Sequence, residues 1–326
     1  MLIKELIDKV QLFIYNKLKY LKLTVKGVSE IYKNLISVDN VKIISLINNS
    51  PKYDSYLKGC FGVSFWIEAG SDNNKKIILF DVGPLVEPLV YNAKLLGLNL
   101  SDIDMIVLSH CHFDHTEALH GVIKEIGHKV PIYAHPDIFR PNFILEPEYM
   151  NYAMKDENNK GNIEKLGGNF IFSKTPIEIY PGVHVTGEVN KVTAFEETGG
   201  VSCFTIDGEG RTIPDRLQDD LSLVINVTGK GLVIITGCGH AGIVNIIKHS
   251  IKVTNINRIE GIIGGFHLLE AKQDRVDKTV ESIKQFSPHW VAPTHCTGII
   301  PTAKFAFAFG DKFKEINAGD IVEINR

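Results

Sequence analysis

The sequence predicts an α/β fold in which two β-sheets pack together and helices cover their outer faces. Three observations lead to this prediction: a β-rich first half, alternating strands and helices in the second half, and a buried strand that runs directly into a cluster of histidines. A sheet must bury its apolar face, and a pair of sheets flanked by helices does so. The 326 residues are enough for one large domain or for a core domain with an insertion.

The N-terminal segment, residues 1–40, is predicted to be a helical extension of a domain that spans residues 41–326. Within it, apolar side chains recur at helical spacing between lysines and acidic residues, at Leu2, Ile3, Leu6, Ile7, Val10, Phe13 and Ile14. This face suits packing on the chain's own core. A membrane surface or a homodimer interface is the alternative.

Short β runs begin near residue 41. They are bounded by turn residues and rich in β-branched and aromatic side chains, at 42–47, 63–69 and 76–83. A helical stretch follows at 87–97, and the buried strand MIVLS occupies 105–109. Residues 137–175 are polar and show no clear period, so we interpret them as an insertion or mobile lid over the site.

The second half returns to regular patterns. Strands are predicted at 177–187, 222–227, 231–237, 259–265 and 289–295, and helices at 242–253 and 275–286. A strand followed by a helix and a further strand is typical of βαβ units, in which the strands are parallel.

Composition limits the function classes. Five cysteines are an odd and sparse set, which suits a reducing compartment better than a disulfide framework. No run approaches the roughly 18 apolar residues of a membrane span, and charged residues interrupt any signal-peptide core. We therefore expect a cytoplasmic protein. A formal charge of −3, without a basic and aromatic strip, disfavours nucleic acid as a partner.

The most informative segment is SHCHFDHTEAL, residues 109–119, at the end of the buried strand. Loops that leave the carboxyl ends of strands are where α/β sheets place their sites. His110 and His112 alternate along an extended backbone and so point the same way, while Asp114 and His115 can face a second position. Zn²⁺ accepts such nitrogen and oxygen donors, and four strongly hydrated side chains this close together have little structural use. The segment therefore predicts metal binding.

This His-x-His-x-Asp-His pattern resembles the signature of the metallo-β-lactamase superfamily, and the likeness extends over roughly residues 41–320. The resemblance implies a four-layer αββα sandwich. It also assigns the ligands, with His110 and His112 at metal 1 and with Asp114, His115 and His295 at metal 2. Asp81, in FDVG, matches a family turn that supports the ligand loop from outside the ligand set.

The middle of the chain departs from the family pattern. GLVIITGCGHAGIVN places Cys238 where a bridging Asp would stand, with His240 two residues later. His240 is the candidate third ligand of metal 1, or else a residue at a helix start that contacts substrate. Cys238 is a ligand or bridge, or else a small residue packed beside the site. His184 and Glu188 lie where the family's usual third histidine would be sought.

Three motifs together resemble one branch of the superfamily: GC-x-H-x-G-I-x-N, GGFHL and HCTG. Members of that branch carry names such as dihydropteroate synthase or ribofuranosylaminobenzene 5'-phosphate synthase homologue. His267, in GGFHL, is expected to line the substrate pocket.

The ligand set implies two divalent metal ions, expected to be zinc, with iron or manganese as alternatives. Such a pair lowers the pKa of bound water toward about 7, and Asp114 can orient the nucleophile or take its proton. The expected function is hydrolysis of a small-molecule ester, above all a phosphodiester or nucleotide-like phosphate, by a metal-bound hydroxide. Two alternatives stay open: a transferase that binds a pterin and a ribose phosphate, and a non-catalytic metal-dependent binding protein.

Overall fold

The computed structural model describes residues 37–71, 74–196 and 203–326. The expected N-terminal helical extension therefore lies outside the described residues. Residues from Val38 to Arg326 form one unit with an α/β fold and mixed sheets.

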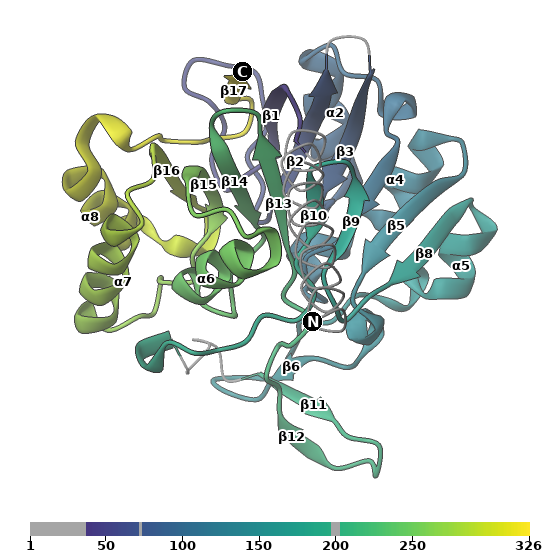
Figure 1. Ribbon diagram of the computed structural model, residues 1–326. Coiled ribbons are helices and arrows are strands. Elements are labelled where there is room, and N and C mark those ends of the chain that lie inside the picture. Colours follow the sequence, from purple (N-terminus) through teal and green to yellow (C-terminus); the bar gives the residue numbers. More distant parts are fainter. Residues whose placement is uncertain (1–36, 72–73, 197–202) are drawn as a thin grey trace, which may run out of the picture. The chain divides into compact units, whose positions relative to one another are not determined.

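Two large sheets lie face to face within this unit (Figure 1). The first has seven strands, in the spatial order β17 (Ile321–Asn325), β1 (Asn40–Ile47), β2 (Ser64–Ser71), β3 (Asn74–Phe80), β4 (Met105–Val107), β5 (Val130–Ala134) and β8 (Gly168–Phe172). The second has six, in the order β16 (Trp290–Thr294), β15 (Ile259–Gly265), β14 (Gly231–Thr236), β13 (Ser222–Val227), β10 (Val183–Val185) and β9 (Ile177–Tyr180). Strands β3, β4, β5 and β8 are parallel, as are β14, β15 and β16, and the other neighbours in these two sheets are antiparallel.

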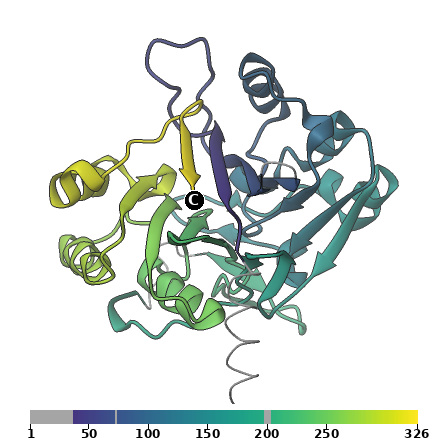
Figure 2. The same cartoon turned by 45° about the horizontal axis from the view of Figure 1, so that its top comes forward.

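Helices cover the outer face of each sheet (Figures 1 and 2). Those on the first sheet are α2 (Val86–Leu95), α4 (Leu119–Ile126) and α5 (Lys160–Lys165). Those on the second are α6 (Ile243–Thr254), α7 (Gln273–Gln285) and α8 (Ile299–Phe309). The order is therefore helices, sheet, sheet, helices. Within the described ranges, no helix is long and apolar enough to cross a membrane.

Shorter helical turns lie in the connections. They are α3 (Phe113–Thr116) and the 3-10 helices η1 (Leu100–Asp102), η2 (Pro136–Phe139), η3 (Asp156–Asn158), η4 (Ala194–Glu196), η5 (His295–Thr297) and η6 (Gly310–Lys312).

Strand β14 shows why these sequence segments form central strands. Val233 and Ile235 face the core between the two sheets, whereas Leu232 and Ile234 face the core beneath the helices. Successive side chains of a strand point to opposite faces, so a strand that is covered on both sides needs an unbroken apolar run. The sequence GLVIIT supplies that run.

The interpretation of residues 137–175 as an insertion is wrong for its second half. Residues 160–165 form α5, and Gly168–Phe172 form β8, which pairs in parallel with β5 in the first sheet. The earlier half contributes β6 (Phe143–Ile144) and β7 (Met150–Asn151) to a small four-stranded sheet. Its other strands are β11 (Phe204–Ile206) and β12 (Thr212–Pro214), and we call these four strands the accessory sheet. Its behaviour as a mobile lid stays a prediction.

The two large sheets direct four loops toward one region. The loop after β4 carries residues 110–115, the loop after β14 carries residues 238–240, and His295 directly follows β16. Asp81 follows β3, the parallel neighbour of β4. Because the carboxyl ends of parallel strands meet at one edge of a sheet, candidate residues from distant parts of the chain come together.

Close packing between β15 and β16 gives a test of the fold. A Cβ atom at Gly261 would overlap the indole ring of Trp290, its partner on β16, which is buried in the core between the sheets. We predict that Gly261→Ala lowers the free energy of unfolding by about 1–3 kcal/mol, as overpacking a core does. Gly208→Ala is the control, because no atom lies within 4 Å of a Cβ there. Urea denaturation measures both, and equal midpoints would contradict this account of the core.

Candidate metal centre

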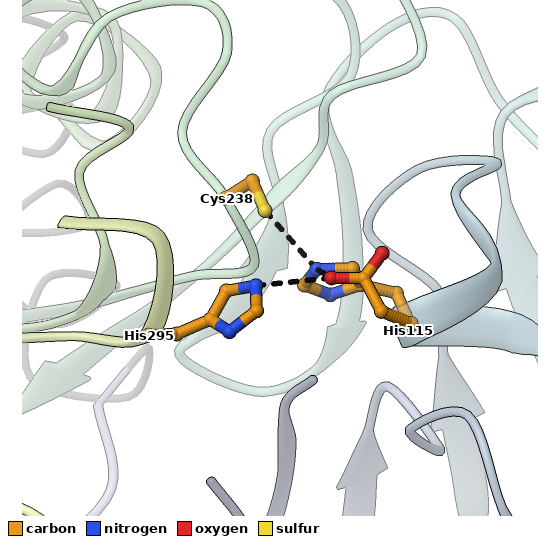
Figure 3. Close-up of side chains that lie close together, drawn as sticks. His115, Cys238 and His295 are labelled. Atoms are coloured by element: carbon orange, nitrogen blue, oxygen red, sulfur yellow. Dashed lines mark hydrogen bonds and ion pairs between the residues drawn. The ribbon is translucent and has the colours of Figure 1, made fainter. Parts of the chain in front are cut away.

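Four potential ligands from three loops form the first cluster. These are Asp114, His115, Cys238 and His295, whose ligand atoms all lie within 4.8 Å of one another. His115 Nε2 lies 3.1 Å from Cys238 Sγ and 3.3 Å from Asp114 Oδ2, and that same oxygen lies 3.0 Å from His295 Nε2. Figure 3 shows Cys238, His115 and His295 converging on one point from separate parts of the chain. All four side chains are buried.

Three histidines form the second cluster. His110, His112 and His240 also place their ligand nitrogens within 4.8 Å of one another. The His240 ring lies 4.8 Å from the His110 ring and 4.9 Å from the His112 ring, centre to centre. The two clusters are adjacent, because the rings of His110 and His115 are 4.3 Å apart. The structure therefore groups His240 with the first two histidines and Cys238 with the remaining ligands.

Unpaired ring nitrogens show that the second cluster fits a metal ion. His110 Nε2, His112 Nε2 and both ring nitrogens of His240 are buried, and no described residue forms a hydrogen bond with them. An unpaired polar atom in the interior is costly, and each such atom normally has a partner. A cation shared by these imidazoles would satisfy them together, and three nitrogens are a usual donor set for zinc.

The protonation of the imidazoles supports the same fit. Burial, reinforced by neighbouring histidines, holds the pKa of His110 and of His240 well below the ordinary value. For His112, burial outweighs the nearby carboxylates and lowers the pKa to about 4. These rings are therefore neutral near pH 7, and a neutral imidazole has a nitrogen lone pair to offer a metal.

In the first cluster the charges are coupled. The carboxylates of Asp114 and Asp81 raise the pKa of His115 well above its usual value, against the effect of burial. Burial favours protonation of Asp114, but the charge of His115 outweighs it and holds the pKa of that carboxyl well below its usual range. Burial, followed by contact with Cys296, raises the pKa of the Cys238 thiol well above normal. Carboxylates that favour a proton on His115 also favour a cation in its place, and a coordinating thiol gives up its proton to the metal.

Hydrogen bonds to the opposite ring nitrogens orient three of the histidines. Asp81 Oδ2 lies 2.7 Å from His115 Nδ1, and Ser109 Oγ lies 2.8 Å from His110 Nδ1. Asn49 Oδ1 lies 2.9 Å from His295 Nδ1. In each case Nε2 is left to face the clusters, which is how proteins usually hold metal-binding histidines. Asp81 thus contacts a histidine of the ligand loop, and Ser109 and Asn49 are further contacts that no sequence pattern indicated.

Two consecutive carboxylates, which no sequence pattern indicated, hold the backbone of both ligand loops. Asp219 Oδ2 accepts a hydrogen bond from the backbone N–H of Cys111 at 2.8 Å, between His110 and His112. Asp220 Oδ2 accepts one at 2.7 Å from the backbone N–H of Ala241, directly after His240. Both aspartates are buried. Together they fix the two segments that supply the second cluster.

The remaining candidates lie outside the two clusters. The His267 ring is 4.2 Å from the His240 ring and lines a cavity beside the clusters, as expected for a pocket residue. His184 lies on β10, 3.8 Å from Glu178, and Glu188 pairs with His135 at 3.1 Å. Neither belongs to a ligand cluster among residues 37–71, 74–196 and 203–326.

Backbone strain marks the same region. Asp81, His267 and His295 have φ values of 57°, 45° and 51°, in the left-handed region that residues other than glycine seldom adopt. Such conformations persist where the surroundings enforce them, and they gather at functional sites.

The two neighbouring histidines 240 and 267 give a matched test of the ligand assignment. We predict that His240→Ala loses the metal of the second cluster and keeps that of the first, because His240 contributes one of the three donors that the described residues supply there. His267→Ala removes an adjacent ring and is expected to keep both metals. Metal content measured by mass spectrometry after gel filtration decides this. Full occupancy in His240→Ala, or equal loss in both variants, would contradict the assignment.

A second test concerns the carboxylate that holds the Cys111 backbone. Asp219→Ala is predicted to weaken metal affinity about 10–100-fold, the usual effect of removing a group that positions ligands. Asp215→Ala is the control: Arg140 bonds both carboxylates, at 2.6 Å to Asp215 and 2.7 Å to Asp219, but Asp215 does not bond the ligand loop. Chelator competition measures the affinities. Equal losses would show that the effect passes through Arg140 instead of the loop amide.

Comparisons with known proteins agree with this geometry. The Metallo-beta-lactamase superfamily profile matches residues 57–213. Over 292 residues the chain is 40% identical to the 7,8-dihydropterin-6-methyl-4-(beta-D-ribofuranosyl)-aminobenzene-5'-phosphate synthase of Methanocaldococcus jannaschii, covering 89% of this chain and 99% of that protein. An uncharacterised protein of the same organism is 29% identical over 239 residues, covering 72% of this chain and 84% of that protein.

A solved structure shows the same fold. It is described as a metal-dependent hydrolase of the β-lactamase superfamily, and it matches with a TM-score of 0.72 and 25% identity over 88% of this chain and 100% of its own. The two buried clusters are consistent with a dinuclear metal site. The chain belongs to the metallo-β-lactamase superfamily of metal-dependent enzymes.

Proposed function

We propose that the chain is a synthase that joins a dihydropterin, at its 6-methyl carbon, to the amino group of a ribofuranosyl-aminobenzene 5'-phosphate. The observation that carries this proposal is the 40% identity to a synthase of that name, over nearly the full length of both chains. Hydrolysis of a phosphodiester, which the metal motif alone favoured, becomes the second candidate.

The reaction is a substitution at carbon. The amine nitrogen forms a bond to the methylene carbon of the pterin, the bond from that carbon to an oxygen leaving group breaks, and the nitrogen loses a proton. We propose a phosphate or diphosphate ester as the leaving group, because it departs as a stabilised anion. Two divalent cations, when bound, supply the positive charge that stabilises such a departing oxygen.

The cavity beside the clusters, which we call the first cavity, has a wall that suits a flat heterocycle. Its volume is about 490 Å³, and the candidate ligands His112, Asp114, Cys238, His240 and His295 form part of its wall. The lining also includes Phe61, Tyr152, Leu269 and Ile299. Aromatic and aliphatic side chains bind planar rings and keep water away from them. Exclusion of water matters here, because water competes with the amine for the same carbon.

Asp114 is the residue that we propose for orienting the amine. Its carboxylate lines the first cavity and contacts His115 and His295. Because its pKa is held well below the usual range, it is ionised at neutral pH and can accept a hydrogen bond from the attacking N–H group. The same carboxylate would orient a water molecule in a hydrolase, so this residue alone does not separate the two candidates.

Hydrolysis is favoured by one comparison, the solved structure described as a metal-dependent hydrolase. Both candidates release a phosphate-type oxyanion beside the clusters. They differ in the nucleophile, which is an arylamine in the synthase and water in the hydrolase.

The test compares product formation with and without the amine. The metal-loaded full chain is incubated with a dihydropterin carrying a diphosphate on its 6-methyl group, with or without 4-(β-D-ribofuranosyl)aminobenzene 5'-phosphate. We predict that diphosphate release requires the amine and equals formation of the coupled product, measured by mass spectrometry. Asp114→Asn is expected to reduce the rate by about 10²-fold or more, whereas Asp274→Asn, at an exposed position on α7, leaves it unchanged.

Two outcomes would contradict the proposal. Equal diphosphate release without the amine would identify a hydrolase. Turnover of bis(p-nitrophenyl) phosphate without any coupled product would do the same.

A further inference from the structure

A second cavity borders the same ligand loop and has a different chemical character. It has a volume of about 550 Å³, and its wall includes Lys191, Arg216, Asp220 and Ala241. Ala241 directly follows His240, which lines the first cavity together with Cys238. Residues 238–241 therefore contribute to the walls of both cavities.

Of the two cavities that border residues 238–241, the second is lined by lysine and arginine and the first, among the described residues, is not. The described residues that line the first cavity include acids and histidines but no lysine or arginine. In the second cavity, Lys191 Nζ donates a hydrogen bond to the backbone carbonyl oxygen of Arg216 at 3.1 Å, and both residues line the wall. Burial lowers the pKa of Lys191; the negative charges of Asp220 and Asp215 oppose this effect, and the positive charges of Arg275 and Arg216 add to it. Positive charges gathered beside a half-buried lysine favour an anionic ligand.

Two of the acidic groups in the wall already have partners. Glu188 pairs with His135 and, at 3.5 Å, with Lys174. Asp215 accepts hydrogen bonds from Arg140 at 2.6 Å and from Asn142 at 2.8 Å. Arg140 therefore offsets much of the negative charge of Asp215, and Lys174 offsets part of that of Glu188, which reduces their repulsion of an incoming anion.

Asp220 differs from these two acids. Its Oδ2 holds the Ala241 backbone N–H, but its Oδ1 is buried and makes no hydrogen bond to any residue within the described ranges. Burial raises the pKa of Asp220 to about 7, and a carboxyl oxygen accepts a hydrogen bond from a hydroxyl group in either protonation state. A site with two cations and one such acceptor matches a ligand that carries both a phosphate and hydroxyl groups.

We propose that the second cavity binds the ribose 5'-phosphate end of the amine substrate. Lys191 and Arg216 bind the phosphate, and Asp220 accepts a hydrogen bond from a ribose hydroxyl. The assignment rests on the proposed function for the identity of the substrate, because a synthase needs a place for the phosphorylated sugar as well as for the pterin. The pterin then occupies the first cavity, and the amine lies between the two cavities.

Direct binding tests this assignment without requiring turnover. Calorimetric titrations of the metal-loaded full chain use ribose 5-phosphate, ribose and inorganic phosphate as probes. We expect ribose 5-phosphate to bind more tightly than either of the other two. Lys191→Met is expected to weaken its binding about 10–100-fold, the usual effect of losing a hydrogen bond to a charged group. Lys191→Arg, which keeps the charge, should retain most of the affinity.

A control variant and a second cavity variant separate loss of binding from loss of folding. Lys252→Met removes the same charge from an exposed position at the end of α6 and should leave the dissociation constant unchanged. Arg216 is an exposed loop residue, so Arg216→Ala tests the cavity again if Lys191→Met fails to fold.

Three outcomes would overturn the assignment. An unchanged affinity for ribose 5-phosphate in Lys191→Met and Arg216→Ala would place the phosphate elsewhere, including at the metals. Equal affinities for ribose and ribose 5-phosphate would remove the role of the cations. Equal affinities for inorganic phosphate and ribose 5-phosphate would remove the role of Asp220.

The binding titrations and the coupling assay can reject the two proposals independently. A Lys191-dependent affinity for ribose 5-phosphate, without any coupled product, would support this cavity and reject the proposed synthase. Coupled product with an unaltered KM for the amine in Lys191→Met would support the proposed synthase and reject this cavity as the phosphate site.

Discussion

The arrangement of the candidate site depends on the buried carboxylate of Asp81. This residue follows β3 with a positive φ, and its two oxygens accept hydrogen bonds from the Ser109 backbone N–H and the Ser109 hydroxyl, each at 2.7 Å. Its Oδ2 also contacts His115 Nδ1. One carboxylate therefore fixes the start of the histidine loop and the orientation of a ligand inside it. A charge with no exposed surface is tolerated because each of its oxygens has a partner.

The loop that carries Cys238 packs against this carboxylate. A Cβ at Gly237 would overlap the Ser109 side chain and crowd Asp81, so glycine permits the second sheet to bring Cys238 close to the first. The two halves of the site thus meet through a backbone approach that a larger residue would prevent.

The sequence predicted the central strands well, because their signal is local. The predicted strands at 222–227 and 259–265 coincide with β13 and β15, and the predicted helix at 242–253 differs from α6 by one residue at each end. Helix α8 was missed because its apolar residues do not form a single stripe: Ile300 and Phe307 are exposed, while Phe305 is buried. Strand β8 was hidden in a polar segment, where its pairing with β5 and not its composition determines its structure.

In the candidate site, too, residues with a local sequence signal could be predicted and residues that act through tertiary contacts could not. Ligands within residues 110–115 could be found because several metal-binding residue types occur within six positions. The role of Asp219 could not be found from the sequence, because its carboxylate accepts a hydrogen bond from the backbone N–H of Cys111, a group that every residue except proline offers. No spacing rule connects an acid with an amide more than a hundred positions away, so only the folded chain reveals that contact.

The apolar lining of the first cavity bears on how one fold can serve two reactions. Both candidate reactions release an oxyanion beside the same clusters, so the ligand set constrains the leaving group and leaves the nucleophile open. What distinguishes an amine from water is whether the cavity admits solvent and whether a neighbouring surface holds the amine-bearing molecule. The residues that determine the reaction class therefore lie outside the ligand set.

The spread of the ligands along the chain has a consequence for the protein's lifetime in the cell. Residues 110–115, 238–240 and 295 belong to distant parts of the sequence and to both large sheets. A cation shared by them cross-links the two sheets, and anything that binds the folded chain alone raises its stability by mass action. Degradation that proceeds through unfolded chains slows as that population falls. If such a cation binds, we expect metal supply to affect how much of this protein accumulates, in addition to how much of it is active.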